Sequence, residues 1–233
     1  MFSYYGCKSK IVRKYPKPLY DTIYEPFAGS ARYALEYWEC AVTLIEAYDK
    51  VYRVWKYLQQ ASEAEILGLP EVEPKQKLET VMGFTQLCDE AKWLIGFSVN
   101  SGSSTPKKTA GKRNHWSRDK IRIAGSLHKI RHWNIWHGDY SDAQNIKATW
   151  YIDPPYQRAG KYYPKRIDDY AALGAWCQSR QGQVIVCEND GADWLDFQPL
   201  TSLAGQLHTQ KEVIWYREEN ISIPVQVLIG SYV

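Results

Sequence analysis

Asp153-Pro-Pro-Tyr156 is the part of this chain whose residue types and spacing are best suited to chemistry. It directly follows Ala148 to Ile152, an apolar run that predicts a strand. Open α/β sheets bind ligands beyond the carboxyl ends of such strands. The Asp153 side chain and the Pro154 carbonyl are hydrogen-bond acceptors, and Pro155 lacks the backbone N–H that could compete for them. The motif is therefore a candidate catalytic loop.

Two acceptors beside an aromatic ring suit the chemistry of an exocyclic amine on a nucleobase. Such a nitrogen is a poor nucleophile because its lone pair is delocalised into the ring. Acceptors for its two hydrogens would draw it toward tetrahedral geometry, so that it could attack the methyl group of a sulfonium. Tyr156 would stack on the base, which must leave the duplex to be reached. The alternative is an ordinary turn that ends a strand, because Asp and Pro are common turn residues.

A small-residue loop, Glu25-Pro-Phe-Ala-Gly-Ser-Ala31, follows another predicted strand, Tyr20 to Glu25. A nucleoside or an amino-acid group could approach the backbone of this loop closely, near the start of a helix predicted over 31–39. Glu46 lies at the tip of the next predicted strand, where nucleotide-binding folds place the acid that binds ribose hydroxyls. Asp49 could do the same, although we favour it as the cap of the following helix.

Two further acidic turns follow predicted strands. His137-Gly-Asp-Tyr140 comes after Asn134 to His137, so Asp139 could accept a hydrogen bond from an adenine amino group, or it could serve only as a turn residue. Glu188-Asn-Asp-Gly191 lies at a similar edge, where a helix-capping turn explains it as well as contact with a substrate does.

The elements that must position these residues alternate between strand and helix, which predicts an α/β fold with a mostly parallel sheet. The last two predicted strands are joined by a short polar segment and should form an antiparallel hairpin at the edge. Between Gln60 and Arg131 no strand pattern is convincing, so residues 60–131 are predicted to be a helical insert in a domain formed by 1–59 and 132–233. Helices are also predicted through Val51 to Leu58 and from Asp168 to Arg180. The predicted strands are Tyr20–Glu25, Ala41–Ile45, Asn134–His137, Ala148–Ile152, Gln183–Cys187, Glu212–Tyr216 and Val225–Ile229.

Within the insert, one helical pattern includes Leu78, Val81, Met82, Leu87, Trp93, Leu94 and Phe97. A polar, flexible, basic loop over 100–114 is expected after it. Ser117 could then cap a basic helix that runs through His128.

Positive charge is concentrated between Pro106 and Arg131, whereas the remainder of the chain is net acidic and the formal net charge is only +3. Such a patch can bind a phosphate backbone because neutralised phosphates release counterions. The alternative is a solvated basic helix and loop. Lysines on the loop are expected to contact phosphates, while Arg113 and Arg118 are candidates for reading bases. The residues expected to bind nucleic acid are Lys107, Lys108, Lys112, Arg113, Arg118 and Arg122.

Composition narrows the protein class. The 233 residues are 45% hydrophobic and 24% charged, which is typical of one globular domain with a small insertion. No apolar run is long enough to span a membrane, and the five scattered cysteines indicate neither a disulfide framework nor a metal site. The histidines show no spacing of metal ligands. We therefore expect a cytoplasmic protein without metal, most simply a monomer, with a dimer left open.

The motifs together resemble those of the Dam-like family of DNA adenine methyltransferases. That family has an N-terminal aromatic-to-lysine segment, a cofactor loop, a recognition insert and then a catalytic loop. Here Tyr4-Tyr-Gly-Cys-Lys8 is similar to the first segment and Glu25 to Ala31 to the cofactor loop. Gly138-Asp-Tyr140 looks like its adenine-binding turn, and Asp153 to Tyr156 like its catalytic loop. The resemblance covers most of the chain outside the insert.

The resemblance implies a Rossmann-like methyltransferase fold, S-adenosylmethionine as the cofactor and double-stranded DNA as the partner. It implies site-specific methylation of N6 of adenine, with Asp153, Pro154, Pro155 and Tyr156 as the catalytic residues. Cys7 and Ala31 depart from the family pattern, which has glycine at both positions. Both side chains should crowd the cofactor slightly. The expected cofactor site comprises Tyr4, Lys8, Glu25, Pro26, Phe27, Ala28, Gly29, Ser30, Glu46, Asp139, Tyr140 and Asp153.

Other functions share part of this pattern. N4 of cytosine presents the same electronic problem, so the same acceptors would serve it, and nothing in the sequence excludes RNA as the substrate. A non-catalytic nucleic-acid-binding relative would keep the basic insert. The intact Asp153 to Tyr156 motif favours an enzyme.

Overall fold

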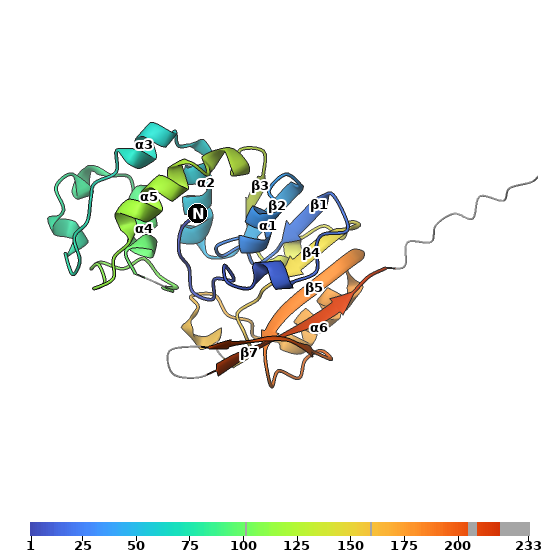
Figure 1. Cartoon of the computed structure of the whole chain (residues 1–233). Helices are drawn as coiled ribbons and strands as arrows, with labels where there is room; N and C mark the ends of the chain where they lie inside the picture. The colour runs from blue at the N-terminus through green and yellow to red at the C-terminus, as the bar shows by residue number, and fades with distance from the viewer. Residues whose placement is uncertain (101, 159, 205–208, 220–233) are drawn as a thin grey trace, which may run out of the picture.

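A computed structural model gives the fold and describes residues 1–100, 102–158, 160–204 and 209–219. Within these residues seven strands form one sheet in the order β3-β2-β1-β4-β5-β7-β6 (Figure 1). The first five strands run parallel, which confirms the prediction of an α/β fold with a mostly parallel sheet. They are β1 (Thr22–Glu25), β2 (Ala41–Glu46), β3 (Asn134–His137), β4 (Ala148–Ile152) and β5 (Gly182–Asn189).

Helices cover both faces of this sheet. α1 (Arg32–Glu36) and α2 (Asp49–Gln60) lie against one face, where α2 buries Val51 and Trp55 one turn apart. This i, i+4 spacing aligns the two side chains on one side of the helix. α6 (Tyr170–Ser179) covers the other face, against β4 and β5, and is capped by the Asp169 side chain.

An antiparallel hairpin closes one edge of the sheet. One of its strands contains the predicted strand Glu212–Tyr216, whereas the other was not predicted. β7 (Thr209–Arg217) pairs with β5 on one side and with β6 (Gln198–Ala204) on the other. The expected partner strand, Val225–Ile229, lies outside the described residues. β6 escaped prediction because Pro199 weakens a strand signal, and proline is tolerated only at an edge or a bulge such as the one found here.

The insert contains three helices, α3 (Glu63–Leu67), α4 (Asp89–Ser98) and α5 (Trp116–Ala124). No strand forms between α2 and β3 in the described residues, and a single bridge joins Lys77 to Thr109. The helical pattern predicted from Leu78 is wrong before Asp89, where the chain forms two short 3₁₀ turns, at Leu78–Thr80 and Phe84–Gln86. These turns accommodate the left-handed Gly83 between them.

α5 also starts and ends differently from the prediction. His115 precedes its first residue, and the helix ends at Ala124 before a 3₁₀ turn at Leu127–Ile130. Ser117 does not cap it, because the Ser117 hydroxyl donates instead to Glu71 at 2.5 Å.

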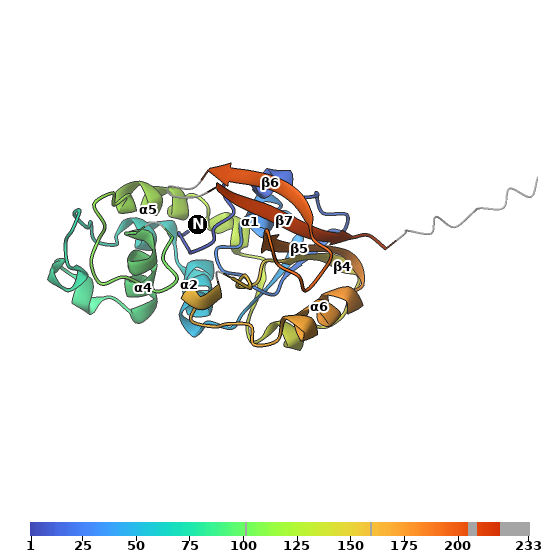
Figure 2. The same cartoon turned by 90° about the horizontal axis from the view of Figure 1, so that it is seen from below.

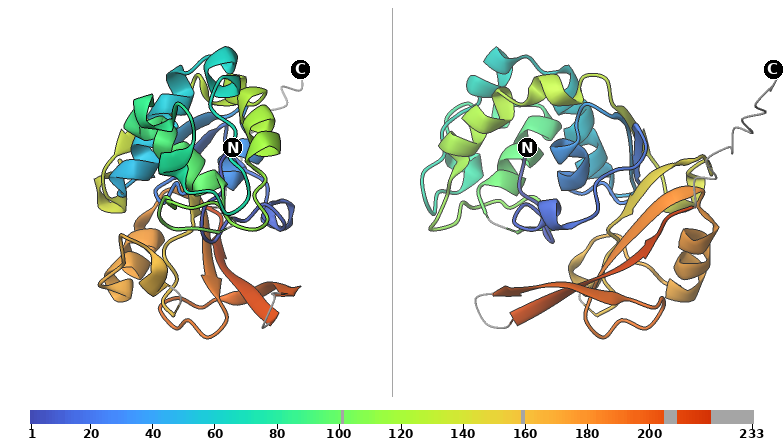
Figure 3. Two further views of the ribbon diagram at one scale, coloured as in Figure 1. Left: turned by 90° about the vertical axis from the view of Figure 1, so that its left-hand side faces the viewer. Right: turned by 45° about the vertical axis from the view of Figure 1, so that its right-hand side comes forward.

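The insert shares its hydrophobic core with the sheet domain. Phe2 lies between α2 and α4, with its ring 5.2 Å from that of Trp55 and 5.7 Å from that of Phe97. The basic loop is anchored too, because Lys107 N–H donates to Gly96 and Leu78 N–H donates to Lys108. Figure 2 shows one end of the β6–β7 hairpin near the helical insert, and in Figure 3 the insert lies above and the hairpin below.

No helix in the described ranges has both the length and the apolarity needed to cross a membrane. All five cysteines are free thiols.

Candidate active site

Two loops meet where the strand order changes direction. β1 and β4 are neighbours in the sheet although far apart in sequence. The loop after β1, residues 26–31, therefore lies beside the loop after β4, residues 153–156. Such a switch point is where open α/β sheets bind ligands, because the loops on either side of it diverge and leave a crevice.

A pocket opens at this point with about 800 Å³ of empty space, part of it open to solvent. This is within the range of sites that hold small cofactors. Every residue that the sequence assigned to the cofactor site lines it: Tyr4, Lys8, Glu25, Pro26, Phe27, Ala28, Gly29, Ser30, Glu46, Asp139, Tyr140 and Asp153. Tyr48 and Tyr163, which the sequence did not single out, line it as well.

The loop from Pro26 to Ala31 has two residues with left-handed backbone. Gly29 has φ 45°, and Ala31 has φ 44° and ψ 50°. Gly29 N–H donates to Glu46 Oε2 at 2.9 Å, and its carbonyl accepts from Trp55 Nε1 at 2.9 Å. The loop therefore keeps a glycine-type conformation despite carrying Ala31.

Cys7 was expected to crowd the pocket, but it does not line it. Arg32 Nε lies 3.1 Å from its sulfur, and Cys7 lines the neighbouring groove instead. Gly6 is the residue of this segment that needs to lack a side chain. Its φ is 73°, and a Cβ there would lie 2.3 Å from the Tyr163 hydroxyl.

Glu46 rather than Asp49 faces the pocket. The second Glu46 oxygen accepts Tyr48 N–H at 2.8 Å, and burial raises the pKa of Glu46 to about 7, although the two backbone donors oppose this shift. Asp49 is exposed and pairs with Arg53 at 3.8 Å. The favoured role of Asp49 as a helix cap is wrong, because Asp49 is the first residue of α2 and the capping position belongs to Tyr48.

Asp139 is a turn residue that also lines the pocket. Its Oδ1 accepts from Ser141 N–H at 3.1 Å in a short turn. Tyr140 stacks against Phe27, with the rings 5.3 Å apart, and forms an apolar wall of the same pocket.

Lys8 joins the N-terminal segment to the catalytic loop. Its ammonium lies 3.1 Å from Asp153 Oδ1, 3.5 Å from Glu212 Oε1 and 4.4 Å from the centre of the Tyr156 ring. Burial lowers the pKa of Lys8, but the Asp153 and Glu212 carboxylates outweigh burial and raise it above its ordinary value. Burial raises the pKa of Asp153, and Lys8 opposes that shift. Lys8 is therefore a buried cation that favours the ionised form of Asp153.

Sequence reasoning missed Glu212 because it appears only as the polar first residue of the predicted apolar strand Glu212–Tyr216. Strand alternation places it on the same face as Ile214 and Tyr216, which pack against the main core. The register of β7 with β5 sets Glu212 opposite Asn189, at the carboxyl end of β5. An acid at the start of an otherwise apolar strand is the signal that could have identified it.

The catalytic loop is held at several points. Tyr170 hydroxyl donates to the Pro155 carbonyl at 2.6 Å, and Gln157 N–H donates to Glu188 Oε2 at 3.0 Å. No hydrogen bond within the described ranges engages the Pro154 carbonyl. Glu188 thus supports the loop, and the helix-capping alternative is wrong because a turn and then β6 follow it.

A second hollow, a groove of about 2050 Å³ that is partly open to solvent, runs between the insert, the N-terminal segment and β7. Tyr156 lines this groove, whereas Asp153 and Pro155 line the pocket, and Lys8 belongs to both. The catalytic loop therefore separates the two hollows. In Figure 3, right, the insert and the hairpin flank the open side of the molecule.

The predicted nucleic-acid residues divide into two groups. Arg113, Arg118 and Arg122 line the groove, whereas Lys107, Lys108 and Lys112 are exposed outside it.

Part of the positive charge of the insert is already committed. Arg118 and Arg122 both pair with Asp119, and Lys120 is buried against Glu71 and the Leu69 carbonyl. Arg131 donates to the Ala61 carbonyl at 2.5 Å. In the described part of the chain, no side-chain hydrogen bond or ion pair engages Lys107, Lys108, Lys112 or Arg113.

Comparisons with known proteins add no assignment, because no protein-family model matches the chain and a search of curated proteins finds no match. No group of three or more His, Cys, Asp or Glu side chains in the described ranges could hold a metal ion. What the chain does must be inferred from the residues of its site.

Proposed function

We propose that this protein transfers a methyl group from S-adenosylmethionine to N6 of adenine in double-stranded DNA. The fold is then a Rossmann-like methyltransferase fold, and a cytoplasmic location follows from the substrate. The observation that carries the proposal is the Asp153 carboxylate in the pocket wall, followed in the chain by a Pro154 carbonyl that no described residue engages, in the loop between the pocket and the groove. These are the two acceptors that an exocyclic amine requires.

The pocket suits the cofactor on physical grounds. Glu46 and Asp139 are carboxylates that could accept from ribose hydroxyls and an adenine amino group, and the Phe27 and Tyr140 rings offer an apolar wall. When bound, S-adenosylmethionine would supply the methyl group on a cationic sulfur.

Each residue of the site then has its own role in methyl transfer. Asp153 and the Pro154 carbonyl accept the two amino hydrogens, so that the nitrogen lone pair is released from the ring. The new N–C bond replaces the S–C bond, and the nitrogen loses one proton, for which Asp153 is the nearest acceptor. Tyr156 lines the groove and would offer the base a face of its ring, and the Lys8 ammonium lies 4.4 Å from the centre of that ring.

The decisive experiment incubates the protein with labelled S-adenosylmethionine and duplex DNA, and then identifies the methylated nucleoside. We expect N6-methyladenine. If the product is N4-methylcytosine, the substrate base is cytosine and the proposed adenine is wrong. If label enters RNA and not DNA, the proposed partner is wrong.

Asp153→Ala should lower the rate of transfer at least about a hundredfold, because a preorganised acceptor is lost, while the dissociation constant for S-adenosylmethionine stays within a few-fold. Asp190→Ala is the matched control, since Asp190 is an exposed acid at the same edge that lines neither hollow. Turnover of the Asp153→Ala protein close to that of the wild type would refute the assigned role.

A further inference from the structure

Glu212 is a buried carboxylate, and two of its three side-chain partners among the described residues, Lys8 and Tyr156, belong to the candidate active site. Its side chain is 5% exposed. Its Oε1 accepts from the Tyr15 hydroxyl at 2.6 Å and from the Tyr156 hydroxyl at 2.5 Å, and Lys8 Nζ lies 3.5 Å away. One oxygen of a strand residue thus joins the N-terminal segment to the catalytic loop.

Stability alone does not explain this arrangement. Burying a charge is costly, and a well-packed apolar side chain of similar size often stabilises a core at least as well as a buried ion pair does. Glu212 also lies among apolar neighbours, on the face of β7 that carries Ile214 and Tyr216. A carboxylate at this position is more simply explained by the geometry that it imposes on its partners.

Two partners of Glu212, Lys8 and Tyr156, also contact Asp153. Lys8 reaches from Glu212 to Asp153, so the position of the ammonium determines which way the Asp153 carboxylate is turned. Tyr156 is held through its hydroxyl, which leaves the tilt of its ring fixed at the edge of the groove.

We propose that Glu212 is a positioning residue for methyl transfer, holding the Lys8 ammonium and the Tyr156 hydroxyl so that the Asp153 carboxylate and the Tyr156 ring meet the target base in one orientation. This inference rests on the proposed function. Glu212 lines the groove and not the cofactor pocket. Its effect should therefore be confined to the transfer step and should not reach cofactor binding.

Glu212→Gln tests this proposal. It keeps the shape of the side chain and an oxygen that accepts from the two tyrosine hydroxyls, but it removes the charge that holds Lys8. Single-turnover methyl transfer should slow roughly ten- to hundredfold, the scale for removing a hydrogen bond to a charged group. The dissociation constant for S-adenosylmethionine should stay within about twofold and the unfolding temperature within a few degrees, a split that a merely structural role would not produce. Glu218→Gln is the control, because Glu218 is an exposed glutamate just beyond the end of the same strand.

A rate within about twofold of wild type overturns the proposal. So does a loss of rate matched by equal losses of cofactor affinity and stability, because Glu212 would then be structural. If Glu212→Gln does not fold, Tyr156→Phe tests the same link, since it removes one hydroxyl and keeps the ring; transfer should slow several-fold with cofactor affinity unchanged, and an unchanged rate overturns the proposal. A wild-type protein that transfers no methyl group refutes the proposed function itself, and this inference with it.

Discussion

At Glu46, a single carboxyl shows how burial and hydrogen bonding compete. Both oxygens accept backbone N–H groups, from Gly29 and Tyr48, which favours the ionised form. Burial outweighs these donors and raises the pKa to about 7. The charge of Glu46 therefore changes near neutral pH, whereas an ordinary glutamate is already ionised there.

If Glu46 binds the ribose of the cofactor, affinity for S-adenosylmethionine should increase as the pH rises from about 6 to 8. The ionised carboxylate is the stronger acceptor, and it forms as the pH passes through its raised pKa of about 7. Isothermal titration calorimetry across this range measures the effect. Glu46→Gln cannot ionise and should show a flat profile over the same range. Parallel profiles for the two proteins would assign the titration to another group and remove Glu46 from the ribose site.

At the scale of elements, the two loops after β1 and β4 meet because their strands are neighbours in a parallel sheet. The sharp turn of the first loop requires strained backbone at one residue. Ala31 adopts left-handed backbone just before α1, a conformation that costs a residue with a Cβ about 1–2 kcal/mol. The site thus contains local strain that a glycine at the same position would not have.

Ala31→Gly should stabilise the protein by up to about 1 kcal/mol, because relief of strain exceeds the added freedom of the unfolded chain. Thermal or denaturant unfolding would measure the change. Ala175→Gly, at an exposed position within α6, should instead destabilise by about 1 kcal/mol, since glycine disfavours an ordinary helical position. Equal losses of stability in both variants would mean that Ala31 is not strained.

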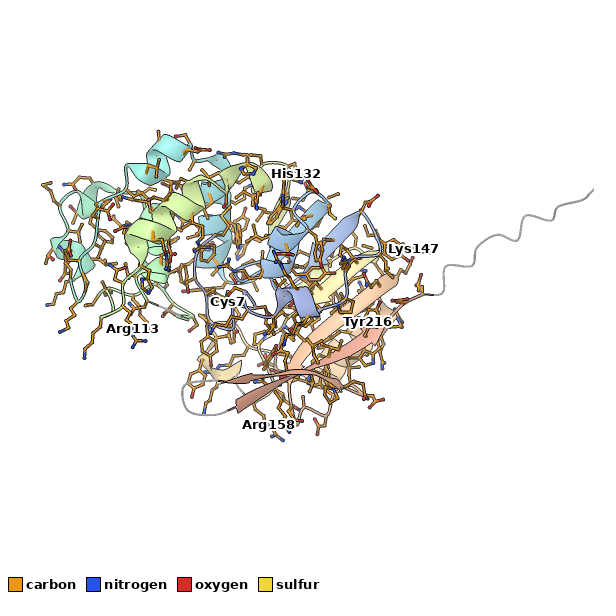
Figure 4. The ribbon with its side chains drawn as sticks, in the orientation of Figure 1. Cys7, Arg113, His132, Lys147, Arg158 and Tyr216 are labelled. Atoms are coloured by element: carbon orange, nitrogen blue, oxygen red, sulfur yellow. The ribbon has the colours of Figure 1, made fainter. Side chains whose placement is uncertain are left out.

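For the whole molecule, charge and shape indicate which surface the proposed DNA substrate would meet. Arg113 lies on the lower side of the insert in Figure 4, whereas Lys147 lies at the opposite end of the molecule. The arginines of the insert line the groove while its exposed lysines lie outside it. This arrangement suits lysines that contact phosphates at the rim and arginines that reach toward the bases.

Replacing Lys107, Lys108 and Lys112 together by Gln should weaken specific and random DNA alike. The slope of log affinity against log salt should fall by about 0.9 for each phosphate that these lysines no longer neutralise. Replacing Lys50, Lys56 and Lys147 removes the same charge from positions outside both the insert and the groove and should leave the slope unchanged. Binding titrations at several salt concentrations compare the two triple variants. Equal slopes would mean that the basic loop does not bind DNA.

The sequence by itself determined the local features of this protein. Apolar runs located β2, β3 and β4. The motifs at the ends of these strands and of β1, together with the N-terminal segment that holds Tyr4 and Lys8, named every residue of the expected cofactor site that now lines the pocket. Motifs at strand ends can be found this way because parallel strands bring their carboxyl ends to one edge whatever the loops contain.

Only the tertiary structure decided the contacts that depend on register and on long-range pairing. Glu212 reaches Lys8 and Tyr156 because antiparallel pairing of β7 with β5 carries it to the site from more than fifty residues away along the chain. The choice of Glu46 over Asp49 followed from which side chain points inward. The partial neutralisation of the insert arginines by Asp119 appeared only once α5 was folded. Sequence patterns describe which face of an element is buried, whereas these contacts depend on which elements meet.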